Sequence, residues 1–186
     1  MEQLELFEQS VKDDRKKGLK EKKYGVQHLN FLIQEREWLN QNKDEGCECR
    51  VCGQNVKRYK RAFNSGMALV LIKLSDWIAD HPSEPFCKVE DHLQEWGLSH
   101  SVRGDFHKAR FWGLIEPDND RRDDGSQRTG YWKLTKEGFD FVFERTTIPS
   151  HVYLYLNNEE GFTKEHISIR DALGTKFDYE ALMYGQ

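Results

Sequence analysis

The chain has 186 residues, of which 37% are hydrophobic and 32% charged, and its formal net charge is −4 at pH 7. This length fits one domain with a smaller addition, and the acidic balance excludes a uniformly basic nucleic-acid coat protein. No apolar run reaches the roughly 18 residues of a membrane helix, so we expect no membrane partner. The first residues lack the apolar core of a signal peptide, so we expect a cytoplasmic protein.

Residues 1–43 are expected to form an N-terminal helical arm. The spacing of Leu29, Leu32 and Ile33 predicts a helix over Val26–Asn42, with these side chains on one stripe. The arm either packs on the body of the protein or pairs with the arm of a second copy in a homodimer. The stripe is thin and is not sustained over heptads, which favours packing on the body.

Residues 44–64 combine a cysteine cluster, which we call the knuckle, with a basic segment. Cys49 and Cys52 form a C-x-x-C pair, a spacing at which two thiolates bind one metal ion from a single turn. Gly53 follows and permits the left-handed backbone that brings N–H groups close to the sulfurs. The knuckle therefore predicts a structural Zn²⁺ site.

The complete zinc ligand set remains open at this stage, because the chain has no second C-x-x-C pair to supply the usual four ligands. Two sets agree with the sequence: Cys47, Cys49, Cys52 and Cys87, or Cys49, Cys52, His81 and Cys87. Incidental thiols in a loop are the alternative, but chance rarely places three of four cysteines so close together. A redox role is disfavoured because no βαβ pattern surrounds the pair.

The basic segment follows the knuckle, and residues 50–61 contain five cations and no acid. On a helix, Lys57, Lys60 and Arg61 would share one face and could bind phosphate. Tyr59 beside them could stack on an unpaired base. An ordinary solvated helix start is the alternative, and the absence of acids favours nucleic-acid binding.

Residues 65–145 contain a regular succession of elements, beginning with three helices. The predicted helices cover residues 65–81, residues 88–96 and a segment from Ser99 or Ser101 to Gly113, with Val102, Phe106 and Ala109 of the third directed inward. The short loop between the second and third helices is typical of a helix-turn-helix.

A strand, a polar hairpin, a second strand and a fourth helix complete this region. The strands are predicted at Leu114–Glu116 and Gly130–Leu134, and Thr135 is expected to cap the helix. Phe139, Val142 and Phe143 are the residues expected on the inner face of that helix.

The phrases FWGLIEP and YWKLTKEGFDFV flank the hairpin, and with the order of elements they resemble winged helix-turn-helix regulators of the MarR and PadR type. The residues that carry the resemblance are Gly113, Leu114, Ile115, Leu134, Thr135 and Gly138. The resemblance covers residues 65–145 and implies that the third helix enters the major groove of double-stranded DNA. The layout of the whole chain resembles winged-helix proteins of phages and prophages.

The residues expected to contact DNA lie on the third helix and in the hairpin, or wing. On the helix they are Arg103, His107, Lys108 and Arg110, and on the wing they are Arg121, Arg122 and Arg128. Arginine reads guanine edges in a bidentate way, and lysine binds phosphate. Four aspartates also lie within residues 118–128, which weakens the attraction of the wing to phosphate.

Residues 146–186 are expected to form a small αβ appendage. A strand is predicted over His151–Leu156, with Val152, Leu154 and Leu156 on its buried face. Ile167 and Ile169 would form a pairing strand, and Asp178 would cap a final helical turn.

The sequence thus predicts an α+β fold centred on a winged helix-turn-helix, with DNA binding, transcriptional regulation in a phage or prophage, and no enzymatic activity. Nucleophile elbows, P-loops and Gly-rich dinucleotide loops do not occur in the sequence. The alternative function is a protein-interaction module, in which the acidic domain binds a host or replication protein. Residues 65–145 contain 11 basic and 15 acidic side chains, which favours that alternative.

Overall fold

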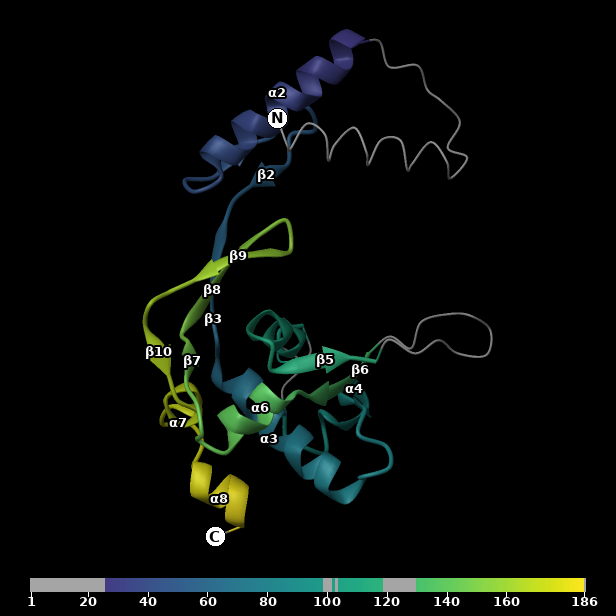
Figure 1. The fold of residues 1–186 in the computed structure, drawn as a ribbon, viewed down its shortest axis with the longest axis vertical. Coiled ribbons are helices and arrows are strands. Elements are labelled where there is room, and N and C mark those ends of the chain that lie inside the picture. Colours follow the sequence, from purple (N-terminus) through teal and green to yellow (C-terminus); the bar gives the residue numbers. More distant parts are fainter. Residues whose placement is uncertain (1–25, 99–101, 103, 119–129, 186) are drawn as a thin grey trace, which may run out of the picture. The chain divides into compact units, whose positions relative to one another are not determined.

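The computed structural model describes residues 26–98, 102, 104–118 and 130–185 and contains both helices and strands (Figure 1). The chain divides into two compact units, unit 1 ending at Lys57 and unit 2 beginning at Arg58. The boundary therefore lies inside the basic segment. No helix in the described ranges is both long enough and apolar enough to cross a lipid bilayer.

In its described residues, 26–57, unit 1 contains one helix and a very short hairpin. Helix α2 spans Val26–Asn42 as predicted, and β1 (Cys47–Glu48) pairs antiparallel with β2 (Asn55–Val56). Across residues 30–57 only Glu35 and Cys49 are buried. This part of unit 1 therefore has almost no apolar core.

Unit 2 has the strands β3 to β10 and five α-helices in its described part, together with one 3₁₀ helix. The helices are α3 (Ser65–Asp80), α4 (Val89–His92), η1 (Phe106–Trp112), α6 (Lys136–Val142), α7 (Ile169–Leu173) and α8 (Tyr179–Tyr184). The strands are β3 (Tyr59–Ala62), β4 (Cys87–Lys88), β5 (Ile115–Pro117), β6 (Tyr131–Leu134), β7 (Ile148–Pro149), β8 (His151–Tyr155), β9 (Asn158–Phe162) and β10 (His166–Ile167).

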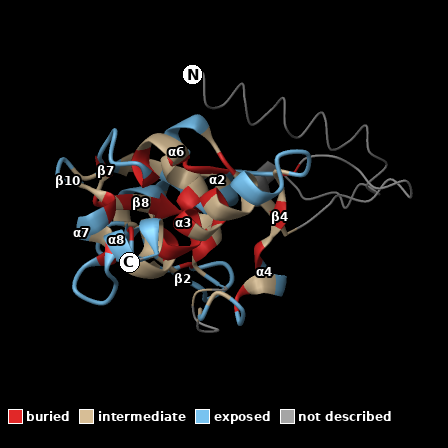
Figure 2. Cartoon of the chain, turned by 90° about the horizontal axis from the view of Figure 1, so that it is seen from below, coloured by how far each residue is buried: buried red, intermediate tan, exposed pale blue. Residues whose placement is uncertain are grey.

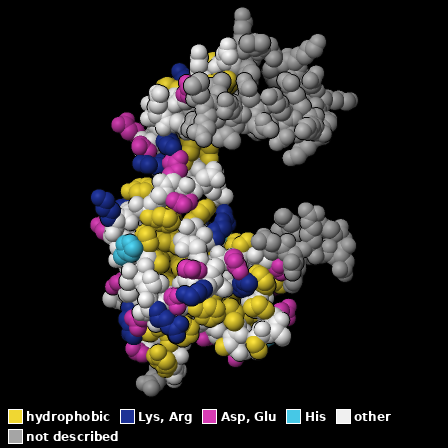
Figure 3. All heavy atoms as spheres, viewed as in Figure 1, with side chains coloured by type: hydrophobic (Ala, Val, Ile, Leu, Met, Phe, Trp, Pro, Cys, Tyr) yellow, Lys and Arg dark blue, Asp and Glu magenta, His cyan; other side chains and the backbone are white. Residues whose placement is uncertain are grey.

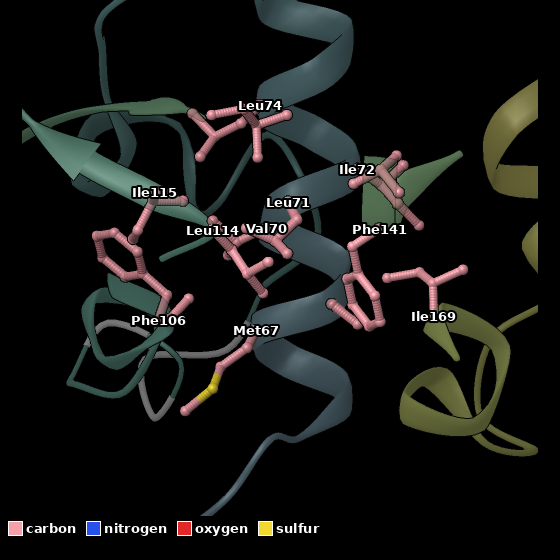
Figure 4. Packing of buried hydrophobic residues seen from close by; sticks show 14 of the residues in the cluster. Met67, Val70, Leu71, Ile72, Leu74, Phe106, Leu114, Ile115, Phe141 and Ile169 are labelled. Atoms are coloured by element: carbon pink, nitrogen blue, oxygen red, sulfur yellow. The ribbon is translucent and has the colours of Figure 1, made fainter. Parts of the chain in front are cut away.

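Helix α3 is the centre of unit 2. Its N-cap is Asn64, whose side chain accepts a hydrogen bond from the Met67 backbone N–H at 3.0 Å. Figure 4 shows apolar side chains on both sides of the helix, with Phe106 and Ile115 on one side and Phe141 and Ile169 on the other. Figure 2 shows the buried residues gathered along the same helix. Each large apolar side chain in such a core contributes about 1.5–3 kcal/mol.

A three-stranded antiparallel sheet in the order β4-β6-β5 accompanies α3, α4 and η1. Strand β6 is the middle strand of this sheet. It pairs with β4 on one side and with β5 on the other. In the described residues the second and third predicted helices are shorter than expected. Phe106 and Ala109 are buried on η1 as predicted.

The two phrases that carry the winged-helix resemblance pack directly on each other. The Thr135 backbone N–H donates to the Leu114 carbonyl at 3.1 Å, and Thr135 Oγ1 donates to the Gly113 carbonyl at 2.6 Å. A Cβ atom at Gly138 would lie 2.1 Å from the same Leu114 carbonyl oxygen. Only glycine therefore permits this approach of α6 to β5.

The second sheet has the order β3-β8-β9, and it corrects the prediction for the basic segment. Residues Tyr59–Ala62 form an edge strand paired with β8, and they do not form a helix. Side chains alternate between faces along a strand, so Lys60 and Arg61 lie on opposite faces. The shared face predicted for Lys57, Lys60 and Arg61 is therefore wrong.

The C-terminal residues belong to the core of unit 2, in contrast to the expected appendage. Ile148, Ile169, Leu173 and Tyr179 join the main hydrophobic cluster, and β7 pairs with β10. The Tyr179 hydroxyl donates to the Val142 carbonyl at 2.8 Å. These contacts tie the last two helices to α6 and α3.

Three apolar residues lie elsewhere than predicted. Leu156 is 71% exposed, because it opens a two-residue turn between β8 and β9 with a φ of 50°. Phe143 is exposed beyond the end of α6, and Phe141 is fully buried in its place. Ile169 begins α7, so only Ile167 lies in the predicted pairing strand.

Candidate functional site

The knuckle is a tight turn between β1 and β2. The Cys49 backbone N–H donates to the Gln54 carbonyl at 2.8 Å, and the Gly53 N–H donates to the Cys49 carbonyl at 2.8 Å. Gly53 has a φ of 72°, which is the left-handed conformation that the sequence predicts. Cys49 and Cys52 therefore flank a single closed turn.

Hydrogen bonds to sulfur prepare Cys49 to act as a thiolate. The backbone N–H of Cys52 donates to the Cys49 sulfur and that of Val51 adds a second bond, so the pKa of Cys49 lies below that of an ordinary thiol. The Cys52 side chain interacts with the same sulfur and is itself exposed. The two thiols thus form a close pair that opens to solvent.

A buried carboxylate joins the knuckle to α2. Glu35 accepts a hydrogen bond from the Arg50 backbone N–H at 2.9 Å and another from Arg50 Nε at 2.7 Å. The guanidinium of Arg50 also lies over the ring of Trp38, 4.2 Å from its centroid. Arg50 lies between the two thiols in sequence, so these contacts fix the orientation of the turn that contains both thiols.

The sequence analysis did not identify Glu35 or Trp38 as functional residues. Charged and aromatic residues are both common on surface helices. Only the fold brings Glu35 and Trp38 to Arg50. The only available signal was their i, i+3 spacing, which places them on one face of α2.

Cys87 and His81 belong to unit 2, whereas the knuckle belongs to unit 1. Cys87 is fully buried in the apolar cluster of unit 2, and this burial raises its pKa to about 12. His81 stacks on Trp77 with ring centroids 3.8 Å apart. Within the part of the chain that the structure describes, no three or more His, Cys, Asp and Glu side chains gather as a metal site.

Strand β3 presents cations and an aromatic ring at the edge of its sheet. Tyr59 is 48% exposed, and the Arg61 guanidinium lies over its ring at 5.2 Å from the centroid. On the other face, Arg58 lies over the ring of Tyr153 at 4.9 Å. Lys60 and Arg61 form no ion pair with any acid in the described ranges. Both are exposed and available to bind an anion.

Lys57 is the last residue of unit 1 and is not part of β3. The methylene groups of its side chain pack beside Gly46, where a Cβ would lie 3.3 Å from Lys57 Cδ. We therefore describe the cations of β3 without it.

The described cations of η1 are engaged by neighbouring side chains. Lys108 Nζ donates to the Asp105 carboxylate, and the Arg110 guanidinium lies over the ring of Phe111 at 4.7 Å. His107 is half-buried, and this burial, followed by the positive charges of Arg110 and Lys108, lowers its pKa. Lys108, Arg110 and His107 are each partly buried. Arg103, Arg121, Arg122 and Arg128 lie outside the described residues.

Charges of both signs are mixed on the surface. Figure 3 shows lysine and arginine side chains beside aspartate and glutamate over the visible face of the molecule. Any electrostatic attraction to nucleic acid must therefore come from local groups such as the cations of β3, because the net charge is −4.

Comparisons with known protein families, with curated protein sequences and with solved structures find no match to this chain. Its function must therefore be argued from its own residues.

Proposed function

We propose that the chain binds double-stranded DNA and that unit 2 is a winged helix-turn-helix domain. The proposal is supported by the order α3, β4, α4, η1, β5, β6 and by the strand order β4-β6-β5, which agree with a winged helix. From the resemblance of the whole layout, the biological role proposed is transcriptional regulation in a phage or prophage.

The observation that carries the binding proposal is the cationic edge strand β3. Lys60 and Arg61 are exposed without an acidic partner in the described part of the chain, and each points to a different side of the strand. Phosphate neutralisation by such groups supplies most sequence-independent affinity for DNA. In this proposal the cations of β3 bind the phosphate backbone of the DNA, and the side chains of η1 and the wing contribute any sequence preference.

A structural Zn²⁺ ion bound by Cys49 and Cys52 is the second part of the proposal. Zinc binds thiolates, and the backbone hydrogen bonds to the Cys49 sulfur lower its pKa, which favours the thiolate relative to an ordinary thiol. The hydrogen bonds from Arg50 to Glu35 act as a second shell that holds the turn in place.

The test of DNA binding is the salt dependence of affinity for random duplex DNA, measured by fluorescence anisotropy. The double variant Lys60→Gln/Arg61→Gln removes two exposed cations, so the slope of log K against log salt should fall by about 0.9 for each lost phosphate contact. The matched control is Lys164→Gln/Arg145→Gln, which changes one lysine and one arginine elsewhere on unit 2. The control should keep the slope of the unaltered protein.

The alternative is a protein-interaction module, and exposed apolar residues on the same sheet favour it. Leu156 in the β8–β9 turn and Phe162 on β9 are both exposed. If random-duplex binding is weak and both double variants leave the salt slope unchanged, the DNA proposal fails. Loss of a protein partner on Leu156→Ser would then support the alternative.

A further inference from the structure

The thiol pair of the knuckle supplies only half of a zinc site. A structural zinc ion takes four protein ligands in a tetrahedron. The chain has four cysteines, of which Cys87 is enclosed in the core of unit 2. Among the described residues no third His, Cys, Asp or Glu joins Cys49 and Cys52 in a metal-binding cluster. The described residues thus supply two of the four ligands.

Exposed apolar side chains occur in the knuckle and on the helix face that contacts it. Val51 lies between the two cysteines in sequence and is 50% exposed. Phe31 and Leu32 are 48% and 44% exposed, and they lie one turn before Glu35 on α2. Residues three and four apart share a helix face, so Phe31 and Leu32 lie on the side of α2 that holds the knuckle through Glu35.

We propose that two copies of the chain share one zinc ion, each contributing Cys49 and Cys52, with Phe31, Leu32 and Val51 at the contact between them. This inference rests on the zinc binding proposed above and identifies where the remaining ligands come from. A twofold axis through the metal would supply two equivalent thiol pairs, which completes four ligands without another residue type. The same axis would bring the two exposed apolar patches together.

A second copy fits these observations better than a different partner. An unrelated protein would need its own exposed thiol pair, whereas a second copy has one by definition. The apolar patch is small, so the metal must contribute to holding the dimer, and the dimer should depend on zinc. Exposed apolar side chains at the edge of the metal would also exclude water from the thiolates.

The experiment measures zinc content and mass on the purified full chain. Metal analysis should find about one zinc ion for two chains, and light scattering should give twice the 22.0 kDa of one chain. A strong chelator should convert the dimer to monomer, and added Zn²⁺ should restore it. Cys52→Ser should abolish both zinc binding and the dimer, while circular dichroism shows that unit 2 stays folded.

Two further variants separate the metal from its surroundings. Cys47→Ser should retain the dimer and the zinc ratio, because the proposed site does not use this thiol. Val51→Ser should retain the zinc ratio at high protein concentration but should raise the dimer dissociation constant about tenfold, as expected for a lost apolar contact.

Three results would overturn the inference: a monomer with one zinc ion per chain, a dimer that survives complete removal of zinc, or a chain that binds no zinc. The first of these leaves zinc binding intact and assigns the site to one chain. DNA is not part of the measurement, so a zinc-bridged dimer that fails to bind DNA would end the DNA proposal and leave this inference standing.

Discussion

The two units of the chain are stabilised by different means. Unit 2 encloses fully buried apolar side chains such as Leu71, Ile72 and Phe141 around α3. In unit 1, residues 30–57 bury only Glu35 and Cys49, and the hairpin has two residues in each strand. A segment that buries so little apolar surface gains little from core packing, so a metal ion or a contact with another chain would add to its stability. The thiol pair therefore lies in the described part of the chain with the smaller apolar core.

A cavity in the core of unit 2 has the largest expected effect, and it tests whether the two units are stabilised by different means. Leu71→Ala should destabilise unit 2 by about 2–5 kcal/mol, because a fully buried leucine leaves a space that its neighbours only partly fill. Urea denaturation followed by tryptophan fluorescence measures the change, since four of the five tryptophans lie in unit 2. Zinc binding by unit 1 should persist.

The control for this cavity is Leu156→Ala, which should change stability by less than about 0.5 kcal/mol because the side chain is exposed. If Leu71→Ala also released zinc at the urea concentration where unit 2 unfolds, the two units would fold as one. The contrast between them would then be wrong.

The junction of α6 and β5 gives the second test. Alanine normally favours a helix over glycine by about 1 kcal/mol. At Gly138 the added Cβ would lie 2.1 Å from the Leu114 carbonyl oxygen, so Gly138→Ala should cost about 1–3 kcal/mol instead. Gly104→Ala is the matched control, because a Cβ there meets no atom within 4 Å. Equal urea midpoints for the two variants would contradict the close approach.

The third test concerns the hydrogen bonds that join Arg50 in the knuckle to Glu35 on α2. Glu35→Ala removes two hydrogen bonds to Arg50 and should destabilise the knuckle by about 1.5–3 kcal/mol, as for bonds to a charged group. Hydrogen exchange of residues 44–57 should accelerate, and zinc should transfer faster to a chromogenic chelator. Unit 2 should keep its urea midpoint. The control is Glu37→Ala, which changes an exposed acid on the same helix and should leave the exchange unchanged. Equal acceleration in both variants would show that the Glu35–Arg50 bonds do not hold the knuckle.

Local patterns predicted much of unit 2. The predicted caps at Thr135 and Asp178 are both present, because a side chain that bonds the first turn is a short-range signal. Helix α2 also has its predicted bounds. The Gly-Leu-Ile and Leu-Thr phrases pack on each other, so the motif has a structural reason in this chain whatever its family.

The errors arise where long-range pairing decides the structure. Five cations near a helix start gave no sign that Tyr59–Ala62 would pair with residues about ninety positions later, since edge-strand pairing is set by the partner. Leu156 continued an alternating pattern, but the hairpin reversed one residue earlier. Glu35 was an unremarkable acid on a polar helix until the fold brought Arg50 to it.

The smallest expected effect is a pH dependence within unit 2, and it sharpens the contrast with the thiolates of unit 1. The Ser168 backbone N–H donates to the Asp171 carboxylate at 2.8 Å and the Ser168 hydroxyl at 2.7 Å, and these bonds lower the pKa of Asp171 from its ordinary value of 3.8. A lowered pKa means that the folded state favours the ionised form. Its stabilising contribution is therefore complete above the ordinary value and disappears as the pH falls through the lower, folded value.

Asp171→Asn should thus be slightly less stable than the unaltered protein at pH 7, and the two urea midpoints should converge as the pH falls below 3.8. Ser168→Ala removes one donor to the carboxylate and should reduce the same pH dependence. Zinc release, followed separately with a dye, should occur at higher pH, because protons compete with the metal for both thiolates. Midpoints that differ equally at pH 7 and pH 3 would show that Asp171 acts in α7 without its charge.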